Sequence, residues 1–207
     1  MPPLAKLDKR REPPPRERIL AAARELFYRE GIHAVSVDAI AAAASTNKMT
    51  VYRHFQSKDA LVAAYLGELA AETESAWGAV RTQFPDDADA QLRALLKRVS
   101  RFADEASGRG CAFVNAAVEL GERKHPARRL IEEHKGRQRE RLIALCRAAG
   151  YAKPERLADE LFLLVEGARV SMQSVGREGP GARLYVLAQK LLDATPRRMA
   201  KAARHKS

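Results

Sequence analysis

Residues 36–58, SVDAIAAAASTNKMTVYRHFQSK, constrain the fold of this 207-residue chain more than any other stretch. Ser36, Asn47 and Ser57 each stand where a helix can begin, because their side-chain oxygens can accept hydrogen bonds from the unpaired N–H groups of a first turn. Behind each of them, apolar residues recur at helical spacing. The stretch therefore predicts two short helices joined by a tight connection, followed by the start of a third.

The second of these helices has an inner and an outer face. Val51 and Phe55 are four residues apart and face inward, which leaves hydrogen-bond donors of several lengths outside. Such donors are suited to holding phosphates and probing base edges. We expect phosphate contacts mainly from Lys48, Thr50, Tyr52, His54 and Lys58. We expect Asn47, Met49 and Arg53 to affect sequence preference, and Ser36 completes the predicted DNA-binding set.

The same region resembles the helix-turn-helix of the TetR family of bacterial transcriptional regulators. The resemblance rests on TVYRHF at 50–55, SKDAL at 57–61, RILAAARELF at 18–27, Gly31 and VDAIA at 37–41. It covers about residues 16–66, and a motif of several spaced parts is more specific than any single run. The chain departs from the family pattern at Ser45-Thr46, where a Gly followed by an apolar residue is usual. It departs again at Met49, where Gly is common, so no base preference is carried over.

The resemblance implies a homodimer that binds double-stranded DNA. Two reading helices would enter successive major grooves about 34–36 Å apart, at a roughly palindromic operator. It also implies an unidentified small-molecule effector that binds the body and releases the operator, with repression as the family default. Such a ligand must prefer the non-binding dimer, because tight binding alone shifts no equilibrium.

Composition and charge predict the fold class and the domain organisation of the whole chain. Ala, Leu, Arg and Glu dominate and no segment alternates with period two, so we predict an all-α fold of about nine helices. The net charge of +11 divides into about +5 for residues 1–58, +1 for 59–195 and +5 for 196–207, which suits a polyanion partner. We expect a disordered basic Pro-rich arm (1–15), a helix-turn-helix domain (16–58), a ligand-binding and dimerisation domain (59–195) and a disordered basic tail (196–207).

We expect a long helix from residue 57 to about 84. Side chains that recur in it at intervals of four form one stripe, which periodicity alone assigns to a core. By resemblance, this helix links head to body and lines the ligand cavity. Asn115 and Glu119 interrupt a short apolar helix on one face; they are either a polar handle in a pocket, part of a surface stripe, or a satisfied buried amide. The candidate pocket residues are Tyr65, Leu69, Thr73, Trp77, Phe102, Phe113, Asn115, Glu119, Phe162 and Glu166.

The last two predicted helices, at about 155–175 and 182–194, are more apolar than one small body must bury. In the TetR family the last two helices pair with their symmetry mates in a four-helix bundle, so the resemblance implies a dimer interface here. The alternative is burial within one subunit. The predicted interface residues are Leu161, Leu164, Val165, Ala168, Leu184, Leu187 and Leu191.

Other chemistries have weaker support in the sequence. Cys111 and Cys146 lack zinc spacing and are expected to be reduced thiols, although a redox-responsive regulator acting through Cys111 stays open. His125 and His134, with Glu132 or Glu133, lack a recognised metal-binding spacing. We therefore expect no metal, no cofactor and no catalytic residue, since no nucleophile–base grouping or phosphate loop is present.

The remaining expectations concern the setting of the protein. No apolar run approaches about 20 residues and no secretory signal is recognisable, so we expect a cytoplasmic, nucleoid-associated protein without membrane contact. A nonspecific architectural DNA-binding protein is the alternative to a sequence-specific regulator, because its basic head and tails would also coat DNA.

Overall fold

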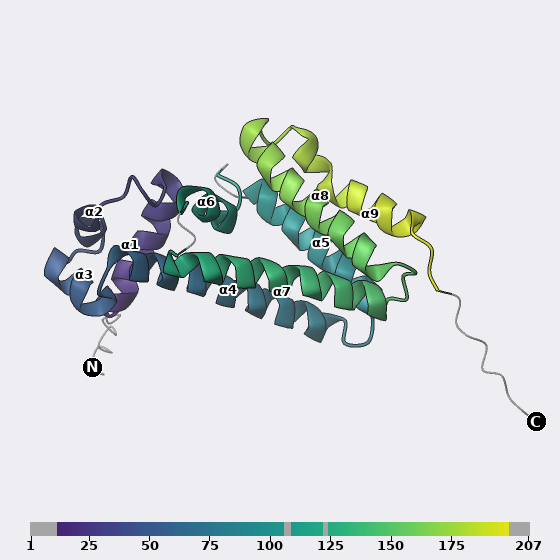
Figure 1. Cartoon of the computed structure of the whole chain (residues 1–207), viewed down its shortest axis with the longest axis horizontal. Coiled ribbons are helices and arrows are strands. Elements are labelled where there is room, and N and C mark those ends of the chain that lie inside the picture. The colour runs from purple at the N-terminus through teal and green to yellow at the C-terminus, as the bar shows by residue number, and fades with distance from the viewer. Residues whose placement is uncertain (1–11, 106–108, 122–123, 199–207) are drawn as a thin grey trace, which may run out of the picture. The chain divides into compact units, whose positions relative to one another are not determined.

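The computed structural model describes residues 12–105, 109–121 and 124–198 (Figure 1). Its elements are α1 (Pro15–Glu30), α2 (Val37–Ala43), α3 (Lys48–Phe55), α4 (Lys58–Gln83), α5 (Ala88–Glu105), α6 (Ala112–Glu119), α7 (Pro126–Ala148), α8 (Pro154–Ser174), the 3₁₀ helix η1 (Pro180–Arg183) and α9 (Leu184–Ala194). No strand occurs in these ranges, which confirms the all-α prediction. The predicted arm up to residue 11, the tail from 199 and the side chain of Phe102 lie outside what is described.

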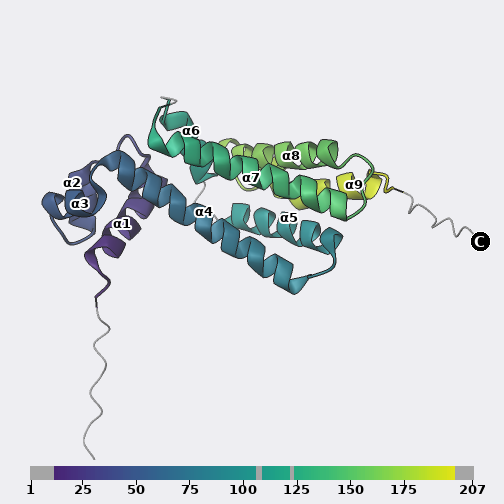
Figure 2. The ribbon, with the colours of Figure 1, turned by 60° about the horizontal axis from the view of Figure 1, so that its bottom comes forward.

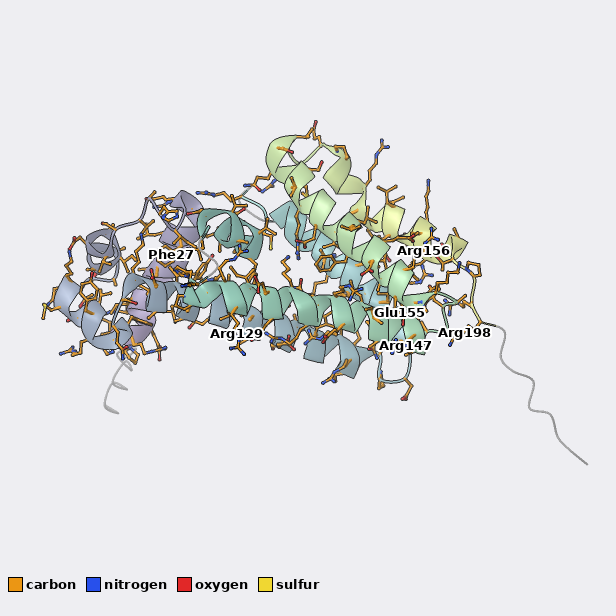
Figure 3. All side chains as sticks on the ribbon, in the orientation of Figure 1. Phe27, Arg129, Arg147, Glu155, Arg156 and Arg198 are labelled. Carbon is orange, nitrogen blue, oxygen red and sulfur yellow. The ribbon has the colours of Figure 1, made fainter. Side chains whose placement is uncertain are left out.

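The chain folds as two compact units, and the boundary between them lies between Tyr65 and Leu66. The first unit, which we call the head, extends seven residues beyond the predicted boundary at 58 because the first two turns of α4 belong to it. Tyr65, predicted as a pocket residue, is buried there and its ring lies 5.7 Å from that of Phe27 (labelled in Figure 3). Tyr65 is therefore part of the head core.

The second unit, which we call the body, is held together by helices that are distant in sequence. α5, α7, α8 and α9 contribute its buried cluster of Leu92, Leu96, Leu142, Cys146, Tyr151, Leu157, Ala158, Leu161, Ala188 and Leu192. α7 and α8 run side by side (Figure 2). Arg147 and Glu155 form an ion pair of 2.5 Å between them (Figure 3). This pair is exposed, so the apolar cluster rather than the ion pair supplies most of the stability.

The body does not end at residue 195, where the sequence predicts a tail. The Ala152 N–H donates to the carbonyl of Pro196 at 2.9 Å, and the Arg198 N–H donates to the carbonyl of Gly150 at 2.7 Å. The guanidinium of Arg197 lies 4.8 Å from the ring centroid of Tyr151. Residues 196–198 are thus attached to the connection between α7 and α8.

A partly buried carboxylate anchors this attachment. Asp89 accepts hydrogen bonds from the Tyr151 hydroxyl at 2.7 Å and from Arg197 at 2.8 Å, and it pairs with Arg93 at 2.8 Å. Burial alone would raise the pKa of Asp89, but the hydrogen bonds from Arg93 and Tyr151 outweigh it and keep that pKa below its usual value. The carboxylate therefore stays charged and ties α5 to the end of the chain.

The outward apolar residues of α8 and α9 overlap with the predicted interface set at Leu187 alone. Leu161, Ala168 and Leu184 are buried inside the body. Leu164, Val165 and Leu191 are half-buried, and Leu187 is exposed. The large apolar side chains that point outward are Leu163, Val170, Val186 and Leu187. Both helices are apolar on two faces, so periodicity could not say which face the protomer itself covers.

Among the residues that the structure describes, every helix is too short or too polar to cross a bilayer.

Candidate nucleic-acid interface

The connection between α2 and α3 is a Schellman motif with serine at the position that usually holds glycine. Ser45 has φ 50°, the Thr46 N–H donates to the Ala41 carbonyl at 2.9 Å, and the Ser45 N–H donates to the Ala42 carbonyl at 3.1 Å. The motif satisfies the last carbonyls of α2 and turns the chain within a few residues. The departure from the family pattern at Ser45 therefore leaves the turn geometry intact but places a side chain in the left-handed region.

Ser45→Gly is expected to stabilise the head by about 0.5 kcal/mol. Glycine removes the left-handed strain of about 1 kcal/mol, partly offset by the greater freedom of glycine in the unfolded chain. Urea denaturation followed by far-UV circular dichroism measures the effect. Ala42→Gly is the matched control, because this exposed position in α2 is expected to lose about 1 kcal/mol instead. Equal destabilisation by both substitutions would show that Ser45 is unstrained.

The three predicted helix caps are confirmed. The side-chain oxygens of Ser36, Asn47 and Ser57 accept hydrogen bonds from the backbone N–H three residues downstream, at 3.1, 2.9 and 3.0 Å. Ser36 and Asn47 were also predicted to contact DNA. Their capping oxygens are already engaged, so their first role is to fix where α2 and α3 begin.

α3 presents one face to the head core and the other to solvent. Val51 and Phe55 are buried, and the guanidinium of Arg16 from α1 lies 5.0 Å from the ring centroid of Phe55. Met49 is 77% exposed and Tyr52 39% exposed. Lys48 and Arg53 complete the outward set. The face combines two cations, a phenol and a flexible apolar side chain, which suits a phosphate backbone beside a base edge.

Two lysines of the predicted set have partners within the head. Lys48 Nζ lies 2.9 Å from Asp38 Oδ2 across the α2–α3 pair, and burial of either group is slight. This hydrogen bond and charge pairing raise the pKa of Lys48. Lys58 Nζ donates to the carbonyl of His33 at 3.5 Å, which links the start of α4 to the α1–α2 connection.

Asp38→Asn is expected to raise the affinity of the head for DNA about fivefold. The substitution removes a carboxylate that competes with phosphate for Lys48. Fluorescence anisotropy of a labelled duplex across a potassium chloride series measures affinity and salt slope together. Asp86→Asn, an exposed site with the same charge change in the body, is the control. If both variants gain equally, net charge rather than Lys48 is responsible.

Thr50 and His54 lie on the flank of α3 and are half-buried. Nε2 of His54 is buried and has no hydrogen-bond partner among the described residues. The sequence predicts a phosphate contact for His54, but its Nε2 is not exposed and cannot make this contact as the head stands. The reason is local geometry, because position 54 stands beside the inward-facing Phe55.

The predicted pocket residues of the body fall into separate groups. Along α4, the hydroxyl of Thr73 donates to the carbonyl of Leu69 at 2.9 Å. Trp77 is buried, with the guanidinium of Arg141 4.9 Å from its ring centroid. In α6, Asn115 donates its amide to the carbonyl of Arg109 at 2.6 Å, so this amide is satisfied by backbone. Glu119 is half-buried on the same helix.

A second group gathers where α6, α7 and α8 meet. Phe113 stacks on His134 with ring centroids 3.9 Å apart. Glu166 pairs with Lys135 at 2.8 Å, and Lys135 Nζ lies 6.0 Å from the ring centroid of Phe162. The structure thus brings Phe113, Phe162 and Glu166 together around two consecutive residues of α7. Sequence reasoning missed Lys135 because nothing local marks it.

The histidines and cysteines are placed apart from one another. His125 caps α7 by accepting from the Ala127 N–H at 3.1 Å. No cluster of three potential metal ligands occurs in the described ranges. Cys146 is fully buried in the body core, and burial raises its pKa to about 12. Cys111 is partly exposed and precedes the first turn of α6.

Comparison with known proteins covers both units. The model of bacterial regulatory proteins of the tetR family matches residues 19–65, and that of the tetracyclin repressor-like C-terminal domain matches residues 88–185. The HTH-type transcriptional regulator UidR of Escherichia coli (strain K12) is 45% identical over 53 residues, which are 26% of this chain and 27% of UidR. The chain thus matches about a quarter of the length of this curated relative.

Solved structures extend the similarity to the body. SCO4454, a TetR-family transcriptional regulator from Streptomyces coelicolor, has a TM-score of 0.81 and 30% identity, over 86% of this chain and 94% of its own. A putative transcriptional regulator from Saccharomonospora viridis, solved in complex with choline, has a TM-score of 0.73 over 88% of this chain and 98% of its own. At 19% identity, it shows the fold alone. Since both units match and SCO4454 is similar over nearly its whole length, the chain belongs to the TetR family of DNA-binding transcriptional regulators.

Proposed function

We propose that the protein is a homodimeric repressor that binds a palindromic operator through α3 and leaves it when a small molecule binds the body. The observation that carries the DNA-binding part is the outward face of α3, where Lys48, Met49, Tyr52 and Arg53 stand clear of the head core. A face of donors on a capped, rigid helix suits insertion into a major groove.

The dimer is supported by the outward apolar residues of α8 and α9. Leu163 is 69% exposed and Leu187 41% exposed, and Val170 and Val186 are exposed as well. Large apolar side chains that face solvent on adjacent helices are typical of a surface that a second chain covers. We propose this face as the dimer interface; of the residues predicted from the sequence, it includes Leu187. Light scattering on Leu163→Glu is expected to show monomers, whereas Glu160→Gln on the same helix leaves the dimer intact.

The effector part is supported by the polar groups that the body holds between α6, α7 and α8 and by the family itself. The Saccharomonospora viridis regulator was solved in complex with choline, so a protein of this fold can hold a small molecule. We propose that the body of this chain does so too.

Selection of binding sites from a random duplex pool at about 150 mM salt tests the proposal, because nonspecific phosphate contacts are weak there. One enriched palindrome, with half-sites about one helical turn apart, is expected. An unenriched pool with residual, salt-sensitive binding would favour the architectural alternative.

A thiol-based response is the other alternative, and the exposure of the cysteines assigns it to one residue. Solvent reaches Cys111 but not Cys146. A redox-responsive regulator would therefore lose its response to oxidant in Cys111→Ser while keeping its operator affinity.

A further inference from the structure

Two cations in the body share a single carboxylate. Lys135 of α7 and Arg169 of α8 approach Glu166 at 2.8 and 2.9 Å, and all three side chains are mostly buried. Lys135 Nζ and Arg169 Nη1 also lie 3.7 and 3.8 Å from Sγ of Cys111. Lys135, Arg169 and Glu166 together therefore carry a surplus of one positive charge. A mostly buried charge to which the described residues offer no further counter-charge is unfavourable, so the cluster favours an incoming anion.

The neighbouring residue on α7 adds a hydrogen-bond donor without an acceptor. His134 is 1% exposed and stacks on Phe113. The amide nitrogen of Gln138 lies 2.9 Å from Nε2 of His134; with this amide as donor, Nε2 accepts and the ring proton sits on Nδ1. Nδ1 has no hydrogen-bond partner among the described residues. Buried donors normally find an acceptor, so this N–H points to an oxygen atom that the described residues do not supply.

The donor and the cations belong to one electrostatic environment. Burial first, and then the charges of Lys135 and Arg137, lower the pKa of His134 to about 4; Arg169 acts in the same direction and the carboxylate of Glu74 in the opposite one. The imidazole is therefore neutral near pH 7 and feels the positive charge of both cations. Phe113 and Phe162 supply aromatic surface beside the same groups.

We propose that the effector of this regulator is an organic carboxylate with an apolar or aromatic body, held by Lys135, Arg169 and the Nδ1–H of His134. The inference rests on the proposed function, because it names the chemical class that the effector site of the body accepts. A carboxylate supplies the missing counter-charge and the missing acceptor at once. A cationic ligand would instead add to a positive surplus, and a neutral amide would leave that surplus uncompensated.

The partly exposed thiol of Cys111 provides a direct probe of the site. Its thiolate attacks one sulfur of an aryl disulfide, a protein–reagent disulfide forms, the reagent S–S bond breaks, and the other half leaves as an arylthiolate with the electron pair. We compare the dianionic dithiobis(nitrobenzoate) with the neutral dithiodipyridine. The ratio of the two rates cancels any change in the nucleophilicity of Cys111 itself. The buried Cys146 should stay silent, which Cys111→Ser verifies.

The ratio in the native protein is expected to exceed that of N-acetylcysteine amide about tenfold, because a nearby, partly desolvated cation attracts the anionic reagent. Lys135→Gln is expected to remove most of this preference. Lys97→Gln, an exposed site on α5 with the same charge change, is expected to keep it. A ratio that Lys135→Gln leaves unchanged would overturn the proposal.

Competition completes the test with three ligands of matched shape. Millimolar benzoate is expected to slow the reaction of Cys111 with dithiodipyridine, with benzamide much less effective and benzylamine without effect. His134→Gln removes the Nδ1–H of the imidazole and is expected to weaken protection by benzoate several-fold. Equal protection by all three compounds, strongest protection by benzylamine, or no protection by benzoate would each overturn the proposal. These rates are measured without DNA, so they test the anion site independently of whether the protein represses an operator.

Discussion

A protein carrying Tyr52→Ala together with Lys58→Ala is expected to bind its operator about a thousandfold more weakly. Tyr52 lies on the outward face of α3 and Lys58 begins α4 next to it. A hydrogen bond to phosphate is worth about 1 kcal/mol, and a dimer loses the two contacts in both heads, which gives about 4 kcal/mol. Each 1.4 kcal/mol corresponds to about a tenfold change in the dissociation constant.

The salt dependence of the same variant carries independent information. Each lysine–phosphate contact contributes about 0.9 to the slope of log affinity against log salt, so losing Lys58 in both heads is expected to flatten the slope by about 2. Anisotropy titrations of the selected operator and of an unrelated duplex measure both quantities. Lys97→Ala on α5 is the control. If the double substitution changes neither the affinity nor the salt slope, α3 and the start of α4 do not contact the DNA.

The second large effect is a loss of body stability in mild acid that depends on His134. The pKa of this buried imidazole is lowered from 6.5 to about 4, chiefly by burial and then by Lys135. As the pH falls below about 6.5, the imidazole of His134 takes up a proton in the unfolded chain but stays neutral in the folded chain. The free energy of unfolding therefore decreases. The stability that the neutral His134 contributes is fully present above pH 6.5 and is lost by about pH 4. The free energy of unfolding falls by about 3 kcal/mol over this range.

Urea titrations between pH 7 and pH 4.5 measure this loss through the fluorescence of Trp77, the one tryptophan of the sequence and a buried residue of the body. His134→Gln cannot titrate, so its stability is expected to depend less steeply on pH in this window. His33→Gln alters an exposed imidazole in the head and is expected to keep the native profile. Parallel curves for the native protein and His134→Gln would show that the buried imidazole does not govern the acid response.

The parts of the head that the sequence predicts best are those set by local chemistry. Ser36, Asn47 and Ser57 cap the helices they precede, because a cap needs only a side-chain oxygen and the next three residues. The tight connection was also predicted, but the left-handed backbone of Ser45 was not. Serine carries no signal for that conformation, which the Schellman hydrogen bonds impose.

The parts that the sequence does not predict depend on which face of a helix meets which neighbour. Leu161 and Leu163 are both leucines of α8, yet one is buried and the other is 69% exposed. Likewise, Glu166 was a pocket candidate, but its partners Lys135 and Arg169 become visible only when α7 and α8 are packed together. Helical periodicity finds an apolar stripe but cannot choose between two of them.

The attachment of residues 196–198 has a practical consequence for anyone who handles this protein. Arg197 and Arg198 are held by Asp89 and Gly150, so a truncation after Ala194 would cut off a piece of the fold and expose Tyr151. An affinity tag or fluorescent fusion placed there would compete with the same contacts. Fusions that begin after residue 198 keep these anchors, and a chain shortened for crystallisation should end no earlier than Arg198.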